Sequence, residues 1–260
     1  MMGQPTSAVA CRVIAAIGRS DFPEQLLAVC RELAGCDLCS AFSWEPRRGP
    51  RLLFAAGSIA DIPEFAHCAS RAYMDIYWRR DAVVQRHWVR GSNSSHLLRM
   101  SAADIRDPDY RHDCYQVAHI AERLTLFDTD SPAVSVSGYR AVGRGPTPLQ
   151  MARRLEDAGP TLIAAIRRHT EWMERKEQTV LSHSRSVLLR QAREWGLSER
   201  EAEVATGLAM GQSQSDIAKA SGLTLNSVIT YRRRAYQKLR VADRLELRAM
   251  CDRLIPLAEP

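Results

Sequence analysis

Residues 197–247 read LSEREAEVATGLAMGQSQSDIAKASGLTLNSVITYRRRAYQKLRVADRLEL, and this stretch decides the fold of the C-terminal part of the chain. A hydroxyl residue marks the start of three helices, at Ser198, Ser213 and Thr224, and Gly222 marks the end of the second. Serine and threonine cap helix N-termini, whereas glycine adopts the left-handed conformation that ends many helices. The pattern predicts four helices, and the middle pair, joined by the short turn at Gly222, is a helix-turn-helix.

The third predicted helix, residues 225–239, has two distinct faces. At helical spacing, the residues expected to pack against the first two helices are Leu225, Val228, Ala235 and Leu239. The residues of the other face are Asn226, Ile229, Thr230, Arg233 and Gln237. The segment Thr224–Arg240 holds five basic residues and no acidic one. An exposed helix with polar side chains and a central positive charge fits the major groove of DNA.

Ordered motifs extend over the whole of this segment. They are Leu-Ser-x-Arg-Glu-x-Glu-Val at 197–204, Gly-x-Ser at 211–213, Ile-Ala at 217–218, Ser-Val at 227–228, Lys-Leu at 238–239 and Arg-x-x-Leu at 244–247. With these motifs the segment resembles the LuxR/GerE-type helix-turn-helix domain of bacterial transcriptional regulators. The resemblance implies that Ile229, Thr230 and Arg233 contact base edges. It also implies that Ser213, Gln214, Thr224 and Arg234 lie at or near backbone-contacting positions.

The sequence therefore nominates ten DNA-binding residues. They are Ser213, Gln214, Thr224, Asn226, Ile229, Thr230, Arg232, Arg233, Arg234 and Lys238. We expect Thr230, Arg233 and Asn226 to read bases, and Arg232, Arg234 and Lys238 to neutralise phosphates. Ile229 stands where the family often has a polar or basic residue, and an apolar side chain there can contact a thymine methyl group. The competing interpretation is that the arginine run is only a solvated helix face.

The sequence pattern of the N-terminal part predicts an α+β domain. The expected elements are a helix at 8–34 ended by Gly35, strands at 38–44 and 51–55, a helix at 63–80, strands at 123–127 and 133–140, and a helix from Thr147-Pro148 to about 176 with an interruption at Gly159-Pro160. This order predicts one antiparallel sheet surrounded by helices. Such a domain is similar to PAS and GAF folds and to the autoinducer-binding domain of quorum sensors. We expect a sensor and dimerisation domain at 1–177, a linker at 178–194 and the DNA-binding domain at 195–258.

The last predicted helix of the N-terminal part has a second possible role. Its apolar positions Leu162, Ile166, His169, Met173 and Val180 follow spacings of a short coiled seam between two subunits. Packing of the same positions on the helix's own sheet is the equally supported alternative.

Aromatic residues and one acid are the candidates for an effector pocket. They are Trp44, Tyr73, Tyr77, Asp81 and Trp88. Tyr73, Tyr77 and Asp81 partly resemble the aromatic-plus-aspartate motif of acyl-homoserine lactone receptors, which makes that ligand one option among apolar or aromatic small molecules. Packing in the protein core is the alternative for each of the five.

No motif predicts catalysis, a cofactor or a bound metal. Cys36 and Cys39 have the spacing of a redox or zinc pair but no second pair, so buried thiols are the favoured interpretation. The acidic group at 104–113 is better explained by turns and helix caps than by a metal site. A phosphoacceptor receiver is disfavoured because the first 175 residues contain no lysine, and a P-loop ATPase because the loop motif is absent.

Composition limits the remaining classes. The chain has 260 residues, a formal net charge of +6 and seven cysteines, and 33 of its 36 basic residues are arginine. No stretch predicts a membrane span, and Arg12 interrupts the one early apolar run, so we expect a reduced, cytoplasmic protein. The expected partners are double-stranded DNA, a second copy of the chain, a small effector and RNA polymerase. The alternatives are a constitutive dimeric regulator without a ligand and an N-terminal enzymatic domain.

Overall fold

The computed structural model describes residues 4–45, 48–59, 62, 64–85 and 96–254. Two compact units make up the chain, Met1–Met173 and Glu174–Pro260. In the described part of the chain, no helix combines the length and the apolar character that crossing a membrane requires.

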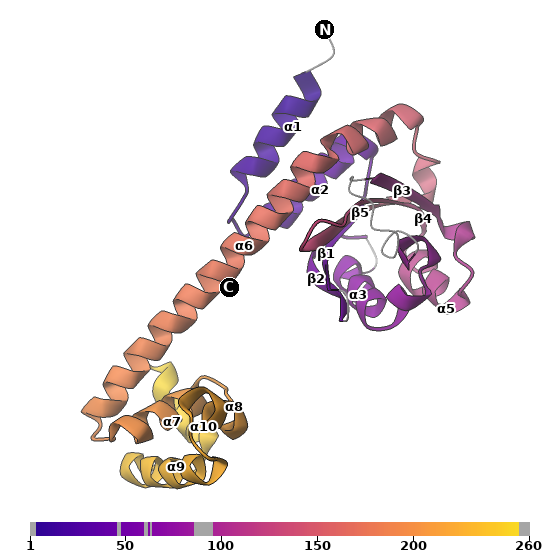
Figure 1. Ribbon diagram of the computed structural model, residues 1–260. Helices are drawn as coiled ribbons and strands as arrows, with labels where there is room; N and C mark the ends of the chain where they lie inside the picture. The colour runs from indigo at the N-terminus through magenta and orange to yellow at the C-terminus, as the bar shows by residue number, and fades with distance from the viewer. Residues whose placement is uncertain (1–3, 46–47, 60–61, 63, 86–95, 255–260) are drawn as a thin grey trace. The chain divides into compact units, whose positions relative to one another are not determined.

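A five-stranded antiparallel sheet forms the centre of the first unit (Figure 1). Its strands are β1 (Leu38–Glu45), β2 (Gly49–Ala56), β3 (His96–Ser101), β4 (Ile120–Asp128) and β5 (Ala133–Ala141). The order across the sheet is β2-β1-β5-β4-β3, so β5 lies in the middle. This architecture confirms the α+β fold expected from the sequence.

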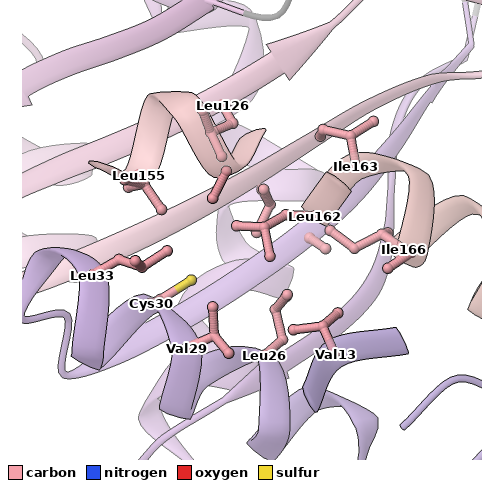
Figure 2. Close-up of a cluster of buried hydrophobic side chains, with 14 of the residues drawn as sticks. Val13, Leu26, Val29, Cys30, Leu33, Leu126, Leu155, Leu162, Ile163 and Ile166 are labelled. Atoms are coloured by element: carbon pink, nitrogen blue, oxygen red, sulfur yellow. The ribbon is translucent and has the colours of Figure 1, made fainter. Parts of the chain in front are cut away.

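Helices cover both faces of this sheet. One face packs against α1 (Gln4–Ala15), α2 (Phe22–Ala34) and the first part of α6 (Leu149–Glu194), through the apolar cluster drawn in Figure 2. The elements on the opposite face are α3 (Phe65–Ala72), the π-helical turn η1 (Tyr73–Tyr77), the 3-10 turn η2 (Trp78–Arg80), α5 (Pro108–Arg111) and the π-helical turn η4 (His112–Gln116). Two further 3-10 turns are η3 (Ala102–Asp104) and η5 (Val142–Arg144).

Strand alternation separates the two cores. In β4, Leu124 and Leu126 pack toward α2 and α6, whereas Arg123 and Phe127 lie on the opposite face. Side chains of a strand point to alternate faces, so a strand covered on both sides is buried almost along its whole length. This explains why β4 and β5 could be recognised from the sequence as apolar runs.

The single helix expected at 8–34 is wrong, because the structure has two helices there. Gly18 interrupts them with φ +81°, a conformation that favours glycine. A Cβ at Gly18 would lie 2.8 Å from the indole of Trp172, so a close approach also requires the glycine. The predicted end of the second helix at Gly35 is confirmed, with a left-handed φ of +67°.

One strand of the first unit was not predicted, and one further expectation is wrong. Strand β3 was not predicted, because its sequence HLLRMS lacks β-branched and aromatic residues and depends on pairing with β4. The predicted interruption at Gly159-Pro160 does not occur, and α6 is continuous with Pro160 inside it. Proline removes one helical hydrogen bond, but buried Leu155, Leu162 and Ile163 pack the helix on the sheet on either side of it.

The coiled seam is contradicted for its first half. Leu162, Ile166 and His169 are buried within the first unit, as the alternative interpretation required, whereas Met173 and Val180 are exposed. The segment proposed as a linker, 178–194, is helical throughout, and Leu188 and Ala192 near its end are buried in the core of the second unit.

The second unit contains the four predicted helices, α7 (Glu199–Ala209), α8 (Gln214–Ser221), α9 (Leu225–Leu239) and α10 (Arg244–Asp252). The cap of α7 is the predicted capping box, in which Ser198 and Glu201 exchange hydrogen bonds with each other's backbone N–H groups. A small core holds the helices together, with Val204, Val228 and Leu247 almost fully buried.

Candidate nucleic-acid interface and sensor cavity

Local sequence fixes how α8 meets α9. The Ser213 hydroxyl accepts a hydrogen bond from the Asp216 N–H at 3.1 Å, and the Thr224 hydroxyl accepts one from the Ser227 N–H at 3.1 Å. Between these two caps, Gly222 ends α8 in a left-handed conformation with φ +65°. Each cap satisfies a backbone donor that the first helical turn leaves unpaired. The predicted helix-turn-helix is therefore confirmed in its caps and its turn.

One face of α9 anchors it to the domain. Val228 and Ala235 have no exposed surface, and Leu239 is half-buried against the same core. Val228 packs with residues of α7 and α8 such as Val204 and Ile217. These contacts orient the helix, Tyr231 and Tyr236 pack partly buried beside them, and the opposite side of the helix is exposed within the described chain.

The opposite face of α9 is exposed and holds five of the ten predicted DNA contacts. Its exposed residues are Leu225, Asn226, Ile229, Thr230, Arg233, Arg234 and Gln237. Leu225 was expected to be buried, and this expectation is wrong because its side chain is 49% exposed. It is the first residue of the helix. Ile229, one turn later, is 39% exposed.

The charge on this face is not neutralised by the domain itself. Among the described residues, the side chains of Arg232, Arg233 and Arg234 form no ion pair or hydrogen bond. Arg232 and Arg233, together with Arg244, also line an open groove between α8, α9 and α10, which contains one acid, Asp243. Fixed positive charges in a concave surface attract a polyanion such as the DNA backbone.

Two other predicted contacts lie at the edge of this groove. Ser213 and Gln214, at the start of α8, line it together with Tyr236 of α9. The backbone at a helix N-terminus carries a partial positive charge, which suits a phosphate oxygen. Ser213 also donates its hydroxyl proton to the Asp216 carboxylate at 2.6 Å, and this contact holds the pKa of Asp216 below its usual value.

Lys238 differs from the other cationic residues of α9. Its ammonium group donates to the Glu201 carboxylate at 2.6 Å and to the Gly196 carbonyl oxygen at 3.3 Å. Burial alone would raise the pKa of Glu201, but the hydrogen bonds from Lys238 and Ser198 bring it below its usual value. Lys238 therefore joins the end of α9 to the start of α7.

The first unit contains a second candidate site, built around Asp81. One Asp81 oxygen accepts from the N–H groups of Val83 and Val84, both at 3.1 Å. The other accepts from Arg123 at 2.7 Å and from the Tyr73 hydroxyl at 3.2 Å. Burial would raise the pKa of Asp81, but the Arg123 guanidinium and these hydrogen bonds bring it below its usual value. Asp81 is thus a buried, charged and fully hydrogen-bonded carboxylate.

Arg123 connects this carboxylate to a group of tyrosines. Its guanidinium donates to the Tyr110 hydroxyl at 2.9 Å, and Tyr110 lies 3.4 Å from the Tyr115 hydroxyl. The Arg123 Nε–H is buried without a partner in the described chain. The buried guanidinium therefore has one hydrogen-bond donor that is not satisfied, which is uncommon for a buried polar group.

A narrow cavity adjoins the tyrosines. Its volume is about 20 Å³, room for roughly one water molecule, and it lies between α3, β1 and η4. Its walls are mainly apolar and aromatic, with Phe65, Ala69, Tyr73, Tyr115 and Tyr139 among the lining residues. Small-molecule sites usually combine apolar walls of this kind with a few polar groups.

The structure brings together only some of the predicted effector-pocket residues. Tyr73 contacts Asp81 directly, whereas the Tyr77 hydroxyl donates to Asp113 instead, which raises the pKa of Tyr77 to about 12. Trp44 is buried and donates its indole N–H to the Ser135 hydroxyl at 2.8 Å. Trp88 lies outside the described residues.

The cysteine pair is buried rather than exposed for chemistry. Cys30, Cys36 and Cys39 are all buried, and burial raises the pKa of each thiol well above its usual value. A reactive thiol needs a lowered pKa and a position that its reaction partner can reach. Within the described residues, no group of three or more His, Cys, Asp or Glu side chains could hold a metal ion.

Two residues at these sites were missed in the sequence. Arg123 was not singled out, although a charged residue inside the buried strand β4 predicts a polar partner on the same face. Leu225 was assigned to the core because its spacing matches Val228, and no signal in the sequence separates the two.

Comparison with known proteins matches residues 196–251 to the family described as bacterial regulatory proteins, luxR family. The comparison with curated protein sequences gives no match. Similar solved structures include SdiA of Escherichia coli, at 14% identity and a TM-score of 0.43, covering 98% of this chain and 99% of that one. The VqsR LBD domain of Pseudomonas aeruginosa shows 15% identity and a TM-score of 0.46, with 65% and 99% covered. A GAF domain/HD domain protein of Geobacter sulfurreducens shows 11% identity and a TM-score of 0.38, with 65% and 99% covered.

Proposed function

Residues 196–251 are a DNA-binding domain of the luxR family of bacterial regulatory proteins, and from this premise we propose that α9 reads a specific DNA sequence in the major groove. The chain is a DNA-binding transcriptional regulator. The observation that carries the proposal is the charge of α9: Arg233 and Arg234 on its exposed face, and half-buried Arg232 beside them, have no partner in the described chain. A helix held by its neighbours on one face and cationic on the other has the form that groove binding requires.

We assign different roles in DNA binding to the residues of this face. Arg233, Asn226 and Thr230 lie together on the exposed surface and are assigned to the base edges. Arg232 and Arg234, with Ser213, Gln214 and Thr224 at the two helix starts, are assigned to the DNA backbone. Lys238 is assigned mainly to the α7–α9 contact, because its ammonium group is already engaged there.

Binding by two copies sets the expected form of the operator. We propose a homodimer whose two α9 helices meet half-sites about one helical turn, ~34–36 Å, apart. Arg232 and Arg234 of each copy give about four phosphate contacts in the dimer, so affinity should fall about 10²-fold between 50 and 200 mM salt.

The test begins with selection of duplexes from a random pool by the full chain. Fluorescence anisotropy then compares the selected duplex with a shuffled one, for the wild type, Arg233→Ala and the control Arg248→Ala. Arg248 is an exposed arginine of α10, so its loss changes the charge of the domain equally without touching α9. Arg233→Ala should weaken the selected duplex by about 1–3 kcal/mol and relax preference at one position, with little change for Arg248→Ala.

Two results would contradict this proposal. Selection that enriches no sequence would exclude specific readout by α9. Equal losses for Arg233→Ala and Arg248→Ala would mean that only total charge matters.

The first unit is proposed to control DNA binding through a small effector. The cavity beside Tyr73, Tyr115 and Tyr139 is the proposed site, because its aromatic and apolar walls suit an apolar or aromatic molecule; at about 20 Å³ it must widen to admit one. An acyl-homoserine lactone is one option, but Asp81 is already satisfied by Arg123 and has little capacity left for it. A ligand that binds only the folded unit must raise its unfolding temperature, which a thermal-shift screen measures. The competing function is a constitutive regulator, and for that protein no ligand would produce a shift.

The remaining assignments follow from the role at DNA. We propose that the chain acts in the cytoplasm, has no enzymatic activity and acts through contact with RNA polymerase. The proposed divisions are a sensor and dimerisation domain at 1–177, a helical connection at 178–194 and the DNA-binding domain at 195–258.

A further inference from the structure

Two large apolar side chains lie exposed on the face of α9 that is assigned to DNA. Leu225 is 49% exposed and Ile229 is 39% exposed. They are four residues apart, so they are neighbours on the helix surface. Exposed apolar side chains at a functional surface are informative when they lie side by side.

The polar groups around this pair have few hydrogens to donate. The Thr230 hydroxyl donates to the Asn226 carbonyl oxygen at 2.9 Å, so its proton is used within the helix. The Thr224 and Ser227 hydroxyls lie 2.9 Å apart and are bonded to each other. The beginning of α9 therefore has less capacity for hydrogen-bonded base reading than its count of hydroxyl residues indicates.

We propose that Leu225 and Ile229 form an apolar patch that contacts the 5-methyl groups of thymines in the operator. The inference rests on the proposed binding of DNA by α9. Thymine presents its 5-methyl group in the major groove, and an apolar side chain discriminates it from cytosine. The first turns of a recognition helix are the part that reaches base edges, and both residues lie there.

Charge around the patch favours DNA over a protein partner. From Thr224 to Arg240 the helix has no acidic residue, and Arg233 follows Ile229 by one turn on the same surface. A positively charged surface around the patch favours a polyanionic partner. In DNA, the apolar group that the major groove exposes is the 5-methyl group of thymine.

The spacing of the two residues predicts the spacing of their contacts. Four residues correspond to a rise of about 6 Å along a helix, and successive base pairs are about 3.4 Å apart. If α9 lies along the groove, the two methyl groups belong to pyrimidines within about two base pairs of each other.

The experiment removes single methyl groups from DNA. The duplex selected by the full chain is remade with uracil in place of each thymine in turn, which deletes the methyl group and keeps the pairing edge. Affinities are measured for the wild type, Leu225→Ala, Ile229→Ala and the control Leu245→Ala. Leu245 is an apolar residue of α10 that is 76% exposed, so its truncation removes a comparable side chain away from α9.

For the wild type, uracil at one or two clustered positions should weaken binding about fourfold each. Ile229→Ala and Leu225→Ala should each abolish the effect at one of these positions, and Leu245→Ala should preserve both. Replacing the affected uracil–adenine pair by 5-methylcytosine–guanine returns the methyl group and should recover part of the lost affinity. The recovery is partial because the two base pairs present different hydrogen-bonding groups in the major groove.

Three outcomes would overturn the inference. If a sequence is selected but every uracil substitution in it changes affinity by less than twofold, the proposed methyl contact is excluded. The proposed function then stands. A uracil effect that persists in both alanine variants assigns the contact to other residues. Selection without any enriched sequence overturns the proposed function and this inference with it.

Discussion

Replacing Arg123 by methionine tests the buried ion pair at the centre of the first unit. The side chains of Arg123 and Asp81 are 4% and 1% exposed, and their charged atoms lie 2.7 Å apart. Breaking such a pair costs about 3–5 kcal/mol, because the remaining charge stays buried without its partner. Asp81 would keep the N–H groups of Val83 and Val84 and the Tyr73 hydroxyl, so we expect the lower end, about 3 kcal/mol.

The pH dependence of this loss has a defined sign. In the wild type the pKa of Asp81 is lowered, so its stabilising effect is present above the unfolded value of about 3.9 and is lost as the pH falls through the folded value. In the Arg123→Met variant, burial remains as the main influence on Asp81 and raises its pKa. As the pH falls, Asp81 is therefore protonated, which removes the free-energy cost of its buried, unpaired charge. The difference in unfolding free energy should be largest near pH 7 and should narrow toward pH 4.

The assay is urea unfolding of the full chain, with amide hydrogen exchange of β4 and β5 assigning the transition to the first unit. The matched control is the double variant Asp81→Asn/Arg123→Met, which removes both charges and should recover part of the lost stability. A loss below about 1 kcal/mol for Arg123→Met, or a double variant no more stable than the single one, would refute the ion-pair reasoning.

Three further predictions concern the helices. Lys238→Met should lower the unfolding free energy of the second unit by about 1 kcal/mol while leaving the salt dependence of DNA binding nearly unchanged; a reduced salt slope would make Lys238 a phosphate contact. Ser198→Ala should cost about 1 kcal/mol by removing the α7 cap, and Ser198→Asp should preserve it; equal stability of both variants and the wild type would show that the cap is dispensable. His169 accepts from the Gly18 N–H at 3.1 Å, and burial lowers its pKa, so the first unit should lose stability as the pH falls from about 7 to 5, and His169→Gln should weaken that dependence; an unchanged pH profile would assign it to other groups.

The helix-turn-helix could be predicted closely because its signals are local. Ser198, Ser213 and Thr224 cap helices whose N-termini need an acceptor, and the chain around each is sufficient to specify the cap. The glycine at 222 has the left-handed conformation that the turn requires. These features depend on neighbours within four residues, which a sequence displays directly.

The features that were missed depend on distant parts of the chain. The break at Gly18 is fixed by Trp172, which lies far along the sequence. Strand β3 forms because β4 offers it a partner. Arg123 became recognisable as the partner of Asp81 only when β4 and the segment after η2 were brought together. Periodicity also placed Leu225 with the core, although the folded domain leaves this first residue of α9 49% exposed.

The central claim is that the exposed face of α9 is the surface that DNA covers. Amide hydrogen exchange of the full chain, with and without its selected duplex, tests this most directly. We expect the largest added protection at Thr224–Arg234 and the start of α8, with α10 little changed. Protection confined to α10 or to the first unit, with α9 exchanging as in the free protein, would contradict the account.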